Sequence, residues 1–163
     1  MVYLDLERFL NPSQSVRGGF PVLFPITGGL PDNRLSLPQG EFKLGQHGFA
    51  RQLPWSLEAL ADGAGLQLQL ADTEETLKSY PFSFLLTMEV RLAPGSLEIT
   101  TLVENRSSDT MPFSFGLHPY FNLSSLESVR FEGLSARCLN HLTMADASTA
   151  CLLYTSPSPR DRG

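Results

Sequence analysis

Apolar and polar residues alternate most regularly between residues 82 and 104. In the first half of this stretch, every second position is apolar: Phe82, Phe84, Leu86, Met88, Val90 and Leu92. In the second half, the apolar or β-branched positions are Leu97, Ile99, Thr101 and Val103. A period of two predicts strands that bury one face. The segment 93–96 (Ala-Pro-Gly-Ser) between them has the composition of a tight turn, so the pattern predicts a β-hairpin.

Shorter apolar runs predict further strands at residues 53–60, 65–71, 112–117 and 128–131. No segment of ten or more residues shows an apolar stripe with helical spacing. Twelve prolines and thirteen glycines fit many short strands joined by turns. The pattern therefore predicts an all-β fold, either a sandwich or a barrel.

Two segments depart from strand periodicity. Residues 10–40 are dense in Gly and Pro, which is typical of a long connection. Such a connection is either a functional loop or a surface loop whose glycines only satisfy backbone geometry, and composition favours neither. The acidic residues Asp72, Glu74 and Glu75 predict a solvated turn.

Composition and charge narrow the function classes. An apolar share of 42%, a charged share of 18% and 163 residues are typical of one globular domain with a core. The formal net charge of −5 argues against nucleic-acid binding, which needs clustered Lys and Arg. No apolar run approaches the roughly 20 residues of a membrane span, and no secretory signal is visible at the N-terminus. The isolated Cys138 and Cys151 favour a reduced, cytoplasmic chain.

The C-terminal residues 151–163 are rich in Ser and Pro and carry no strand period. A DNA string that resembles the transposase adapter of sequencing libraries can encode their first part, CLLYTSPSPRD. We therefore expect residues 1–150 to belong to the β-domain and residues 151–163 to be a non-native tail that is excluded from the fold. A disordered native C-terminus is the alternative.

Candidate chemistry begins with two arginines and a histidine. Arg17 precedes two glycines, which let a backbone approach a ligand closely, and Arg binds phosphate or carboxylate through two parallel hydrogen bonds. The alternative is an arginine in a solvated turn. If the sequence Gln-His-Gly-Phe-Ala-Arg is extended, His47, Phe49 and Arg51 point to one face and could form one wall of a polar pocket. Otherwise His47 is an ordinary hydrogen-bonded histidine.

A second histidine, His118, lies in the sequence Phe-Ser-Phe-Gly-Leu-His-Pro-Tyr-Phe, among large apolar side chains. Histidine in such a setting suits general acid–base catalysis, although a core histidine bonded to a backbone carbonyl is the commoner occurrence. His141 has no neighbours that suggest a role. Three scattered histidines lack the ligand spacing of a zinc site, and no nucleotide-binding loop or nucleophile elbow is present.

Four motifs, taken in order, resemble the aldose 1-epimerase superfamily, and they are closest to its glucose-6-phosphate 1-epimerase (hexose-6-phosphate mutarotase) branch. They are Arg-Gly-Gly-Phe-Pro-Val-Leu-Phe-Pro, Gln-His-Gly-Phe-Ala-Arg followed by Pro-Trp, Tyr-Pro-Phe-Ser-Phe, and Leu-His-Pro-Tyr-Phe. The resemblance covers about residues 13–135. It implies a galactose mutarotase-like antiparallel β-sandwich, the supersandwich, which residues 1–150 contain only in part. It also implies a monomer when full-length that binds a small sugar or sugar phosphate in a cleft on one sheet, with no metal or organic cofactor.

The resemblance also implies roles for individual residues. The family interconverts α and β anomers: a base removes the proton of the C1 hydroxyl while an acid protonates the ring oxygen. It assigns the general acid to His118, an assisting hydrogen bond to His47, and binding of the 6-phosphate to Arg17 and Arg51. A pair of arginines suits a phosphate dianion better than a neutral sugar, which favours a hexose-6-phosphate over a free hexose.

The family's general base, a glutamate, and a sugar-binding aspartate belong to its C-terminal part. If residues 151–163 are a non-native tail, neither residue lies in this chain. We therefore expect the 163-residue chain alone to be inactive and poorly soluble. Two other classes stay open. A non-catalytic carbohydrate-binding β-sandwich would not need His47 and His118 at one sugar. A structural or interaction domain would not show sugar-phosphate binding that depends on Arg17 and Arg51.

Overall fold

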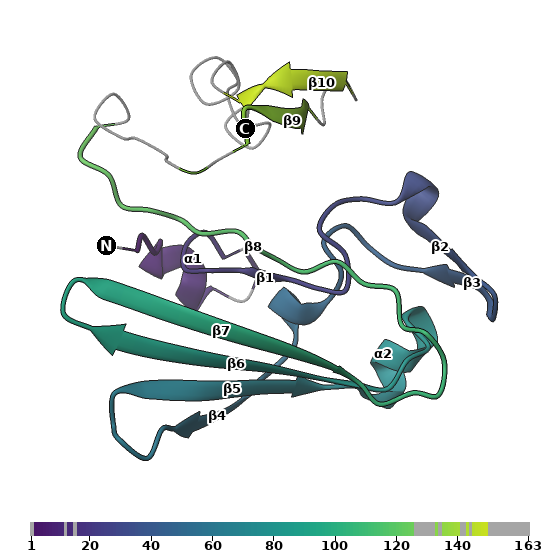
Figure 1. Cartoon of the computed structure of the whole chain (residues 1–163), viewed down its shortest axis with the longest axis horizontal. Helices are drawn as coiled ribbons and strands as arrows, with labels where there is room; N and C mark the ends of the chain where they lie inside the picture. Colours follow the sequence, from purple (N-terminus) through teal and green to yellow (C-terminus); the bar gives the residue numbers. More distant parts are fainter. Residues whose placement is uncertain are drawn as a thin grey trace. The chain divides into compact units, whose positions relative to one another are not determined.

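The computed structural model describes residues 2–11, 13–14, 16–125, 133, 135–140, 143 and 145–149. The chain divides into two units, residues 1–122 and 123–163, which are considered separately. The first unit contains all four candidate site residues and most of the described strands (Figure 1). In the second unit, β9 (Arg137–Asn140) and β10 (Ala145–Ser148) form an antiparallel pair.

The largest sheet is antiparallel and has four strands in sequence order. They are β4 (Ser56–Ala59), β5 (Gly65–Ala71), β6 (Phe84–Ala93) and β7 (Ser96–Asn105), as Figure 1 shows. Ala93 pairs with Ser96, so the β6–β7 turn consists of Pro94 and Gly95 alone. Gly95 has φ 76°, a backbone region that glycine enters without steric cost. The predicted hairpin is confirmed.

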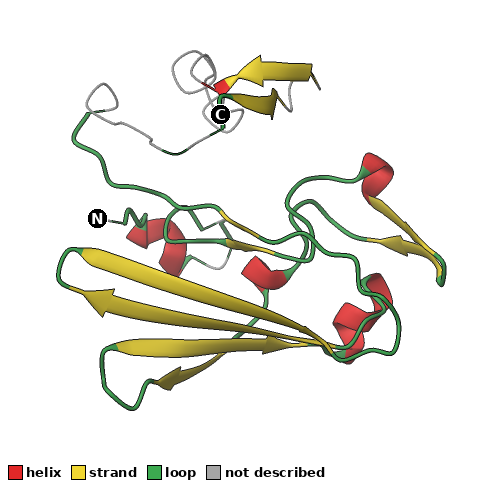
Figure 2. Ribbon diagram, in the orientation of Figure 1, coloured by secondary structure: helices red, strands yellow, loops and turns green. Residues whose placement is uncertain are grey.

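The other elements of the first unit are shorter (Figure 2). β1 (Val22–Leu23) pairs with β8 (Gly116–Leu117), and β2 (Arg34–Leu37) pairs with β3 (Gly40–Lys43). The helices are α1 (Leu6–Leu10), α2 (Glu74–Ser79) and two 3-10 turns, η1 (Pro31–Asn33) and η2 (Ala50–Gln52). No helix in the described part of the chain is long and apolar enough to cross a membrane.

The all-β prediction is confirmed, and the described strands do not close into a barrel. Among the shorter strands, 65–71 is confirmed in full, 53–60 contains β4, and 112–117 contains only the two residues of β8. The Gly/Pro-rich stretch 10–40 is not a bare connection, because it contains β1, β2 and the start of β3. The predicted strand 128–131, His141, Cys151 and the predicted tail 151–163 lie outside the described residues.

Glu74 and Glu75 are exposed, as the prediction of a solvated turn requires, but they belong to a helix. Glu74 and Glu75 form the first turn of α2, where acidic side chains interact favourably with the helix dipole. Thr73 caps the helix: its side chain accepts from the backbone N–H of Thr76, whose own hydroxyl accepts from Thr73 N–H. Asp72 accepts a hydrogen bond from the backbone N–H of Phe84 at 2.8 Å, which ties the segment before the helix to β6.

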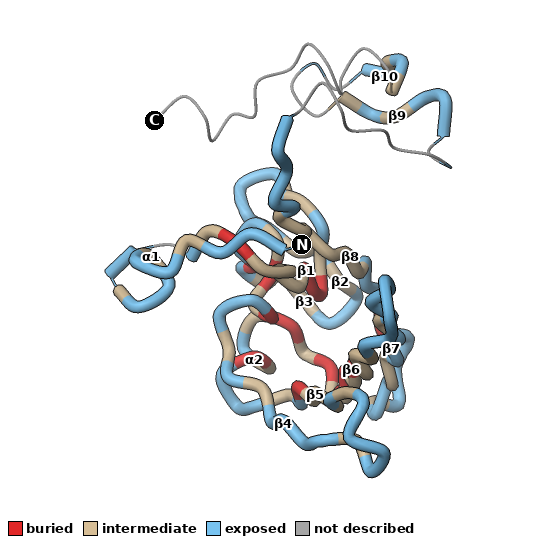
Figure 3. The backbone as a smooth tube through the Cα atoms, turned by 90° about the vertical axis from the view of Figure 1, so that its left-hand side faces the viewer, coloured by how far each residue is buried: buried red, intermediate tan, exposed pale blue. Residues whose placement is uncertain are grey.

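The hydrophobic core lies between one face of the four-stranded sheet and the segment that contains β1 (Figure 3). Its centre is aromatic. The ring centroid of Phe24, directly after β1, lies 5.1 Å from that of Phe84 on β6 and 6.2 Å from that of Tyr80. All three side chains are at most 1% exposed. Each such side chain contributes roughly 1.5–3 kcal/mol on burial, so this cluster fixes the segment that leads to the candidate site against the sheet.

The buried phenol of Tyr80 should make the free energy of unfolding decrease at alkaline pH. Burial raises the pKa of the Tyr80 phenol above its ordinary value of 10.0, and its hydroxyl donates to Pro112 O at 2.9 Å. The pKa of Tyr80 is higher in the folded than in the unfolded protein, so the neutral phenol stabilises the fold. This stabilisation is complete below pH 10, and it is lost as the pH rises from 10 towards the folded-state pKa. We expect the free energy of unfolding, measured by urea titration between pH 8 and 11, to fall less steeply in Tyr80→Phe than in wild type. The exposed Tyr3→Phe is the control for removal of a tyrosine hydroxyl, and an equal change of slope in both variants would contradict the role of burial at Tyr80.

Candidate functional site

The candidate site is built on β1, which has neighbours along both of its edges. On one edge lies β8, with Val22 opposite Leu117 and Leu23 opposite Gly116. On the other edge, Phe24 O accepts hydrogen bonds from the backbone N–H groups of Phe49 (3.0 Å) and Ala50 (3.2 Å). Two segments far apart in sequence therefore meet at the same short strand.

His118 lies on the β8 edge. Its backbone N–H donates to Pro21 O at 3.0 Å, and Tyr120 N–H donates to Gly19 O at 3.0 Å, so the antiparallel ladder continues beyond β8. Val22 packs against the core, and side chains alternate along extended chain, so His118 lies on the face opposite to that of Leu117 and Val22. His118 Nδ1 is buried and has no hydrogen-bond partner among the described residues.

His47 lies on the opposite edge of β1, and its segment is not extended. His47 has φ 67°, and residues 50–52 form η2, so the extended segment that would place His47, Phe49 and Arg51 on one face is not present. Phe49 instead packs into the core, with its ring centroid 6.3 Å from that of Phe24. His47 N–H donates to Gly28 O at 2.7 Å.

Gly48 explains why this segment can approach β1 so closely. It forms a parallel bridge with Phe24, and a Cβ at Gly48 would overlap the Phe24 carbonyl. Its φ of 66° also lies in the region that favours glycine. Trp55 also holds this turn, because its indole N–H donates to Ala50 O at 2.9 Å.

The two candidate arginines lie at different ends of this arrangement. Arg17 precedes β1 on the His118 side, where its carbonyl accepts from Asp5 N–H at 2.8 Å. Arg51 belongs to η2 on the His47 side, and its guanidinium donates to Gln46 O at 3.3 Å. Of the nine described Lys and Arg residues, six pair with a carboxylate, and Arg17, Arg51 and Lys43 do not pair with one among the described residues.

Two features near the site were missed from the sequence. The ring of Tyr120 lies against that of His118, with centroids 5.2 Å apart and planes tilted by 40°. Their spacing of two residues on an extended segment was the available signal. Ser114, whose hydroxyl accepts from Thr27 N–H at 2.9 Å, fastens the chain leading to β8 onto the loop that follows β1. The sequence carried no signal for that contact because 87 residues separate its partners.

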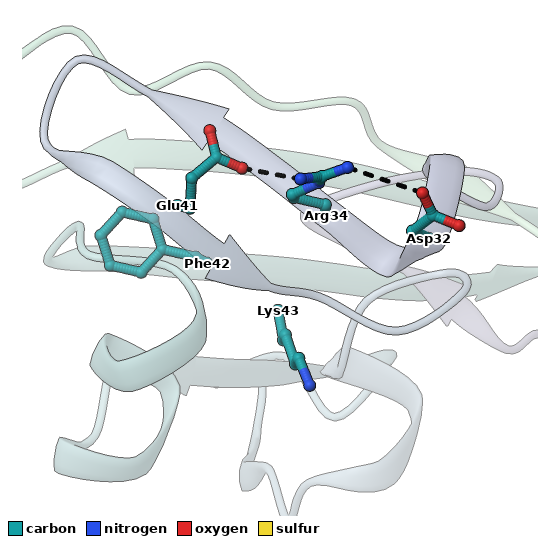
Figure 4. A pocket seen from close by; sticks show the side chains of 5 residues that line it. All are labelled: Asp32, Arg34, Glu41, Phe42 and Lys43. Carbon is teal, nitrogen blue, oxygen red and sulfur yellow. Dashed lines mark ion pairs between the residues drawn. The ribbon is translucent and has the colours of Figure 1, made fainter.

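A cavity of about 330 Å³ lies on the β2–β3 pair, away from the candidate histidines. Arg34 forms ion pairs with Asp32 (3.6 Å) and Glu41 (3.7 Å), and Phe42 and Lys43 complete the lining (Figure 4). The guanidinium is thus neutralised by two carboxylates, which leaves Lys43 as the only unpaired charge among these five residues. Across the described ranges, no three His, Cys, Asp or Glu side chains group as they would around a metal ion.

Comparison with known proteins agrees with this architecture. The sequence profile described as "Aldose 1-epimerase" matches residues 5–150. A protein from Cenchrus ciliaris named "Putative glucose-6-phosphate 1-epimerase" is 34% identical over 145 residues, which cover 82% of this chain and 41% of that protein.

Two solved structures share the fold. The Slr1438 protein from Synechocystis sp. PCC 6803 has a TM-score of 0.79 at 36% identity, and the match covers 91% of this chain and 52% of that one. A "galactose mutarotase related enzyme" from Lactobacillus acidophilus has a TM-score of 0.61 at 38% identity, with coverage of 68% and 37%. The chain thus spans about half the length of these relatives, or less. The antiparallel galactose mutarotase-like fold inferred from the four motifs is confirmed, and the chain belongs to the aldose 1-epimerase family.

Proposed function

We propose that this chain is part of an isomerase that interconverts the α and β anomers of a hexose or hexose-6-phosphate. Family membership supports this proposal, and one observation carries it: His118 and His47 come from segments on the two edges of the same strand, β1. Two interstrand spacings separate those segments, about 10 Å. A pyranose bound at β1 would thus lie between the segment of His118 and the segment of His47.

The proposed reaction opens and recloses the sugar ring. A base takes the proton of the C1 hydroxyl, the bond between C1 and the ring oxygen breaks, and His118 gives a proton to that oxygen through Nε2. The resulting aldehyde rotates about the C1–C2 bond, and the reverse steps close the ring on the other face of C1. His47 donates or accepts a hydrogen bond near the reacting centre. The base, by family resemblance, is a glutamate beyond residue 150, so we propose that residues 1–163 alone are inactive.

The phosphorylated sugar is the substrate that we favour. Arg17 and Arg51 have no described carboxylate partner, so their charge is available to an anion. One relative's name also refers to glucose-6-phosphate. An arginine with no carboxylate to neutralise it binds a phosphate dianion through charge-assisted hydrogen bonds.

Replacing Arg51 with glutamine should weaken binding of glucose-6-phosphate about 10- to 100-fold, because a hydrogen bond to a charged group contributes about 1.5–3 kcal/mol. Binding of unphosphorylated glucose should not change. Calorimetric titration of wild type, Arg17→Gln and Arg51→Gln at two salt concentrations measures this effect. Arg106→Gln is the matched control, since Arg106 is paired with Glu104 at 3.7 Å. Equal losses for Arg106→Gln and Arg51→Gln would contradict the phosphate role.

The activity is tested with a completed protein, in which residues 5–150 are joined to the part of the Slr1438 protein that lies outside the matched half. The completed protein should accelerate the optical-rotation change of freshly dissolved α-glucose-6-phosphate, and the 163-residue chain should not. If the completed protein folds and binds the sugar phosphate but does not accelerate the change in optical rotation, it is a non-catalytic carbohydrate-binding β-sandwich. Acceleration by the 163-residue chain would show that the base lies within it.

A further inference from the structure

The side chain of Tyr120 forms a wall beside the imidazole of His118. The two ring centroids lie 5.2 Å apart with planes tilted by 40°, which is within the range in which aromatic rings attract each other. Both residues are half-buried. They are two positions apart on an extended segment, so their side chains project from the same face of it. The contact is therefore a consequence of the backbone and not of a chance rotamer.

The backbone of this segment gives the two rings a fixed relation. His118 N–H donates to Pro21 O and Tyr120 N–H donates to Gly19 O, each at 3.0 Å. Pro119 lies between them. Its pyrrolidine ring restricts its own φ, and a residue before proline is restricted to extended conformations. The ring of Tyr120 is thus held next to His118 by a stiff stretch of chain that is bonded at both ends.

The imidazole of His118 needs such a wall because a hydrogen bond does not orient it at Nδ1. In a functional histidine, a hydrogen bond to one ring nitrogen usually fixes the ring while the other nitrogen acts on the ligand. His118 Nδ1 is buried and has no hydrogen-bond partner among the described residues. The χ2 torsion of histidine is broad and roughly two-fold, so packing has to select the ring orientation.

We propose that Tyr120 is a positioning residue for the general acid: its ring holds the imidazole of His118 in the orientation that protonates the ring oxygen of the sugar. This inference rests on the proposed function, since it concerns the acid of that reaction. The observed contact joins two rings, so the flat ring of phenylalanine should replace that of tyrosine. Leucine has no flat ring to lie against the imidazole and should not replace it.

The experiment measures kcat and KM of the completed protein for glucose-6-phosphate. Tyr120→Leu should lower kcat about 10- to 100-fold, because a displacement of about 1 Å is enough for such a loss, and should leave KM within about 3-fold of wild type. Tyr120→Phe should keep both constants within about 3-fold. In the His118→Ala background, Tyr120→Leu should cause no further loss of rate, because a residue that acts only through His118 then has nothing to position.

The matched control is Phe121→Leu. The side chain of Phe121 projects from the opposite face of the segment, and its ring packs edge-on against that of Phe20 with centroids 6.2 Å apart. This variant should have the kcat and KM of wild type. Circular dichroism shows whether each variant folds. If Tyr120→Leu does not fold, Tyr120→Met takes its place with the same expected result, because its unbranched side chain adapts to an irregular space.

A second measurement does not depend on activity. In the completed protein with isotope-labelled histidine, the NMR signals of His118 are those missing from His118→Ala. Their three-bond couplings, which report the χ1 torsion, should show one rotamer in wild type and Tyr120→Phe and an average of rotamers in Tyr120→Leu. If the completed wild type is inactive, the proposed function fails, and these couplings still decide whether Tyr120 orients His118.

Three results would overturn the positioning role. The first is a single His118 rotamer in Tyr120→Leu. The second is a rise in KM with an unchanged kcat in that variant, which would make Tyr120 a substrate contact. The third is an equal loss of rate from Tyr120→Leu with and without the imidazole of His118, which would show that Tyr120 acts independently of it.

Discussion

Replacement of His118 with alanine should slow anomer interconversion by the completed protein about 10²- to 10⁴-fold, the usual contribution of a positioned general acid. The backbone of His118 is fixed to Pro21 O at 3.0 Å and its ring lies against Tyr120, so the imidazole has a defined position. The proposed proton transfer to the ring oxygen uses this imidazole, and alanine has no group to replace it. The initial rate of optical-rotation change with glucose-6-phosphate, corrected for the rate in buffer, measures the loss.

Two comparisons separate catalysis from folding in this experiment. His47→Ala should cost only about 10-fold, because one hydrogen bond to a charged group contributes about 1.5 kcal/mol at the low end of its range. The KM for the sugar phosphate and the melting temperature should stay close to wild type in His118→Ala. If His118→Ala keeps more than a tenth of the rate, or if His47→Ala is the more damaging change, the assignment of the general acid is wrong.

Replacement of Phe84 with alanine should have the largest effect on stability, about 3–5 kcal/mol. The side chain is fully buried, and its ring lies 5.1 Å from that of Phe24 and 6.0 Å from that of Phe49 by centroid distance. The substitution would leave a cavity between β6 and the segment that carries the candidate site. Whole domains have only about 5–15 kcal/mol of stability, so the variant should be largely unfolded or should melt at least roughly 10 °C lower.

The matched control for Phe84 is Leu102→Ala on β7. Leu102 is 56% exposed and pairs with Thr87, on the face of the sheet opposite to that of Phe84, so its truncation should change the free energy of unfolding by no more than about 0.5 kcal/mol. Urea unfolding followed by Trp55 fluorescence compares the two variants. Similar midpoints for Phe84→Ala and Leu102→Ala would mean that the aromatic cluster does not hold β1 against the sheet.

The β6–β7 hairpin could be predicted because its signal is local. Alternation over ten residues fixes which side chains face the core, and a Pro-Gly pair fixes the turn. Alternation did not predict burial correctly near the end of β6. Leu92 continues the alternation but is 69% exposed, since burial depends on what packs over a face and the strand pattern does not encode that.

The segment 46–51 could not be predicted in this way. Its residues read as a short extended run, yet His47 and Gly48 have positive φ values and Ala50 begins a 3-10 turn. The cause is tertiary: the backbone must pass close to Phe24, where only glycine leaves room, and then return Phe49 to the core. Local propensity gives no information about that approach.

The sequence by itself determined the all-β class, the main hairpin and the residue types of the candidate site, because strand period, turn composition and motif order are properties of neighbouring residues. The tertiary structure alone decided that β8 and the turn around Gly48 flank opposite edges of β1, and that Leu92 lies open at the end of the core face of β6. Contacts such as Thr27 with Ser114, 87 residues apart, depend on how distant segments pack. Such packing is a balance of burial and loop-closure entropy over the whole chain, and no local pattern specifies it.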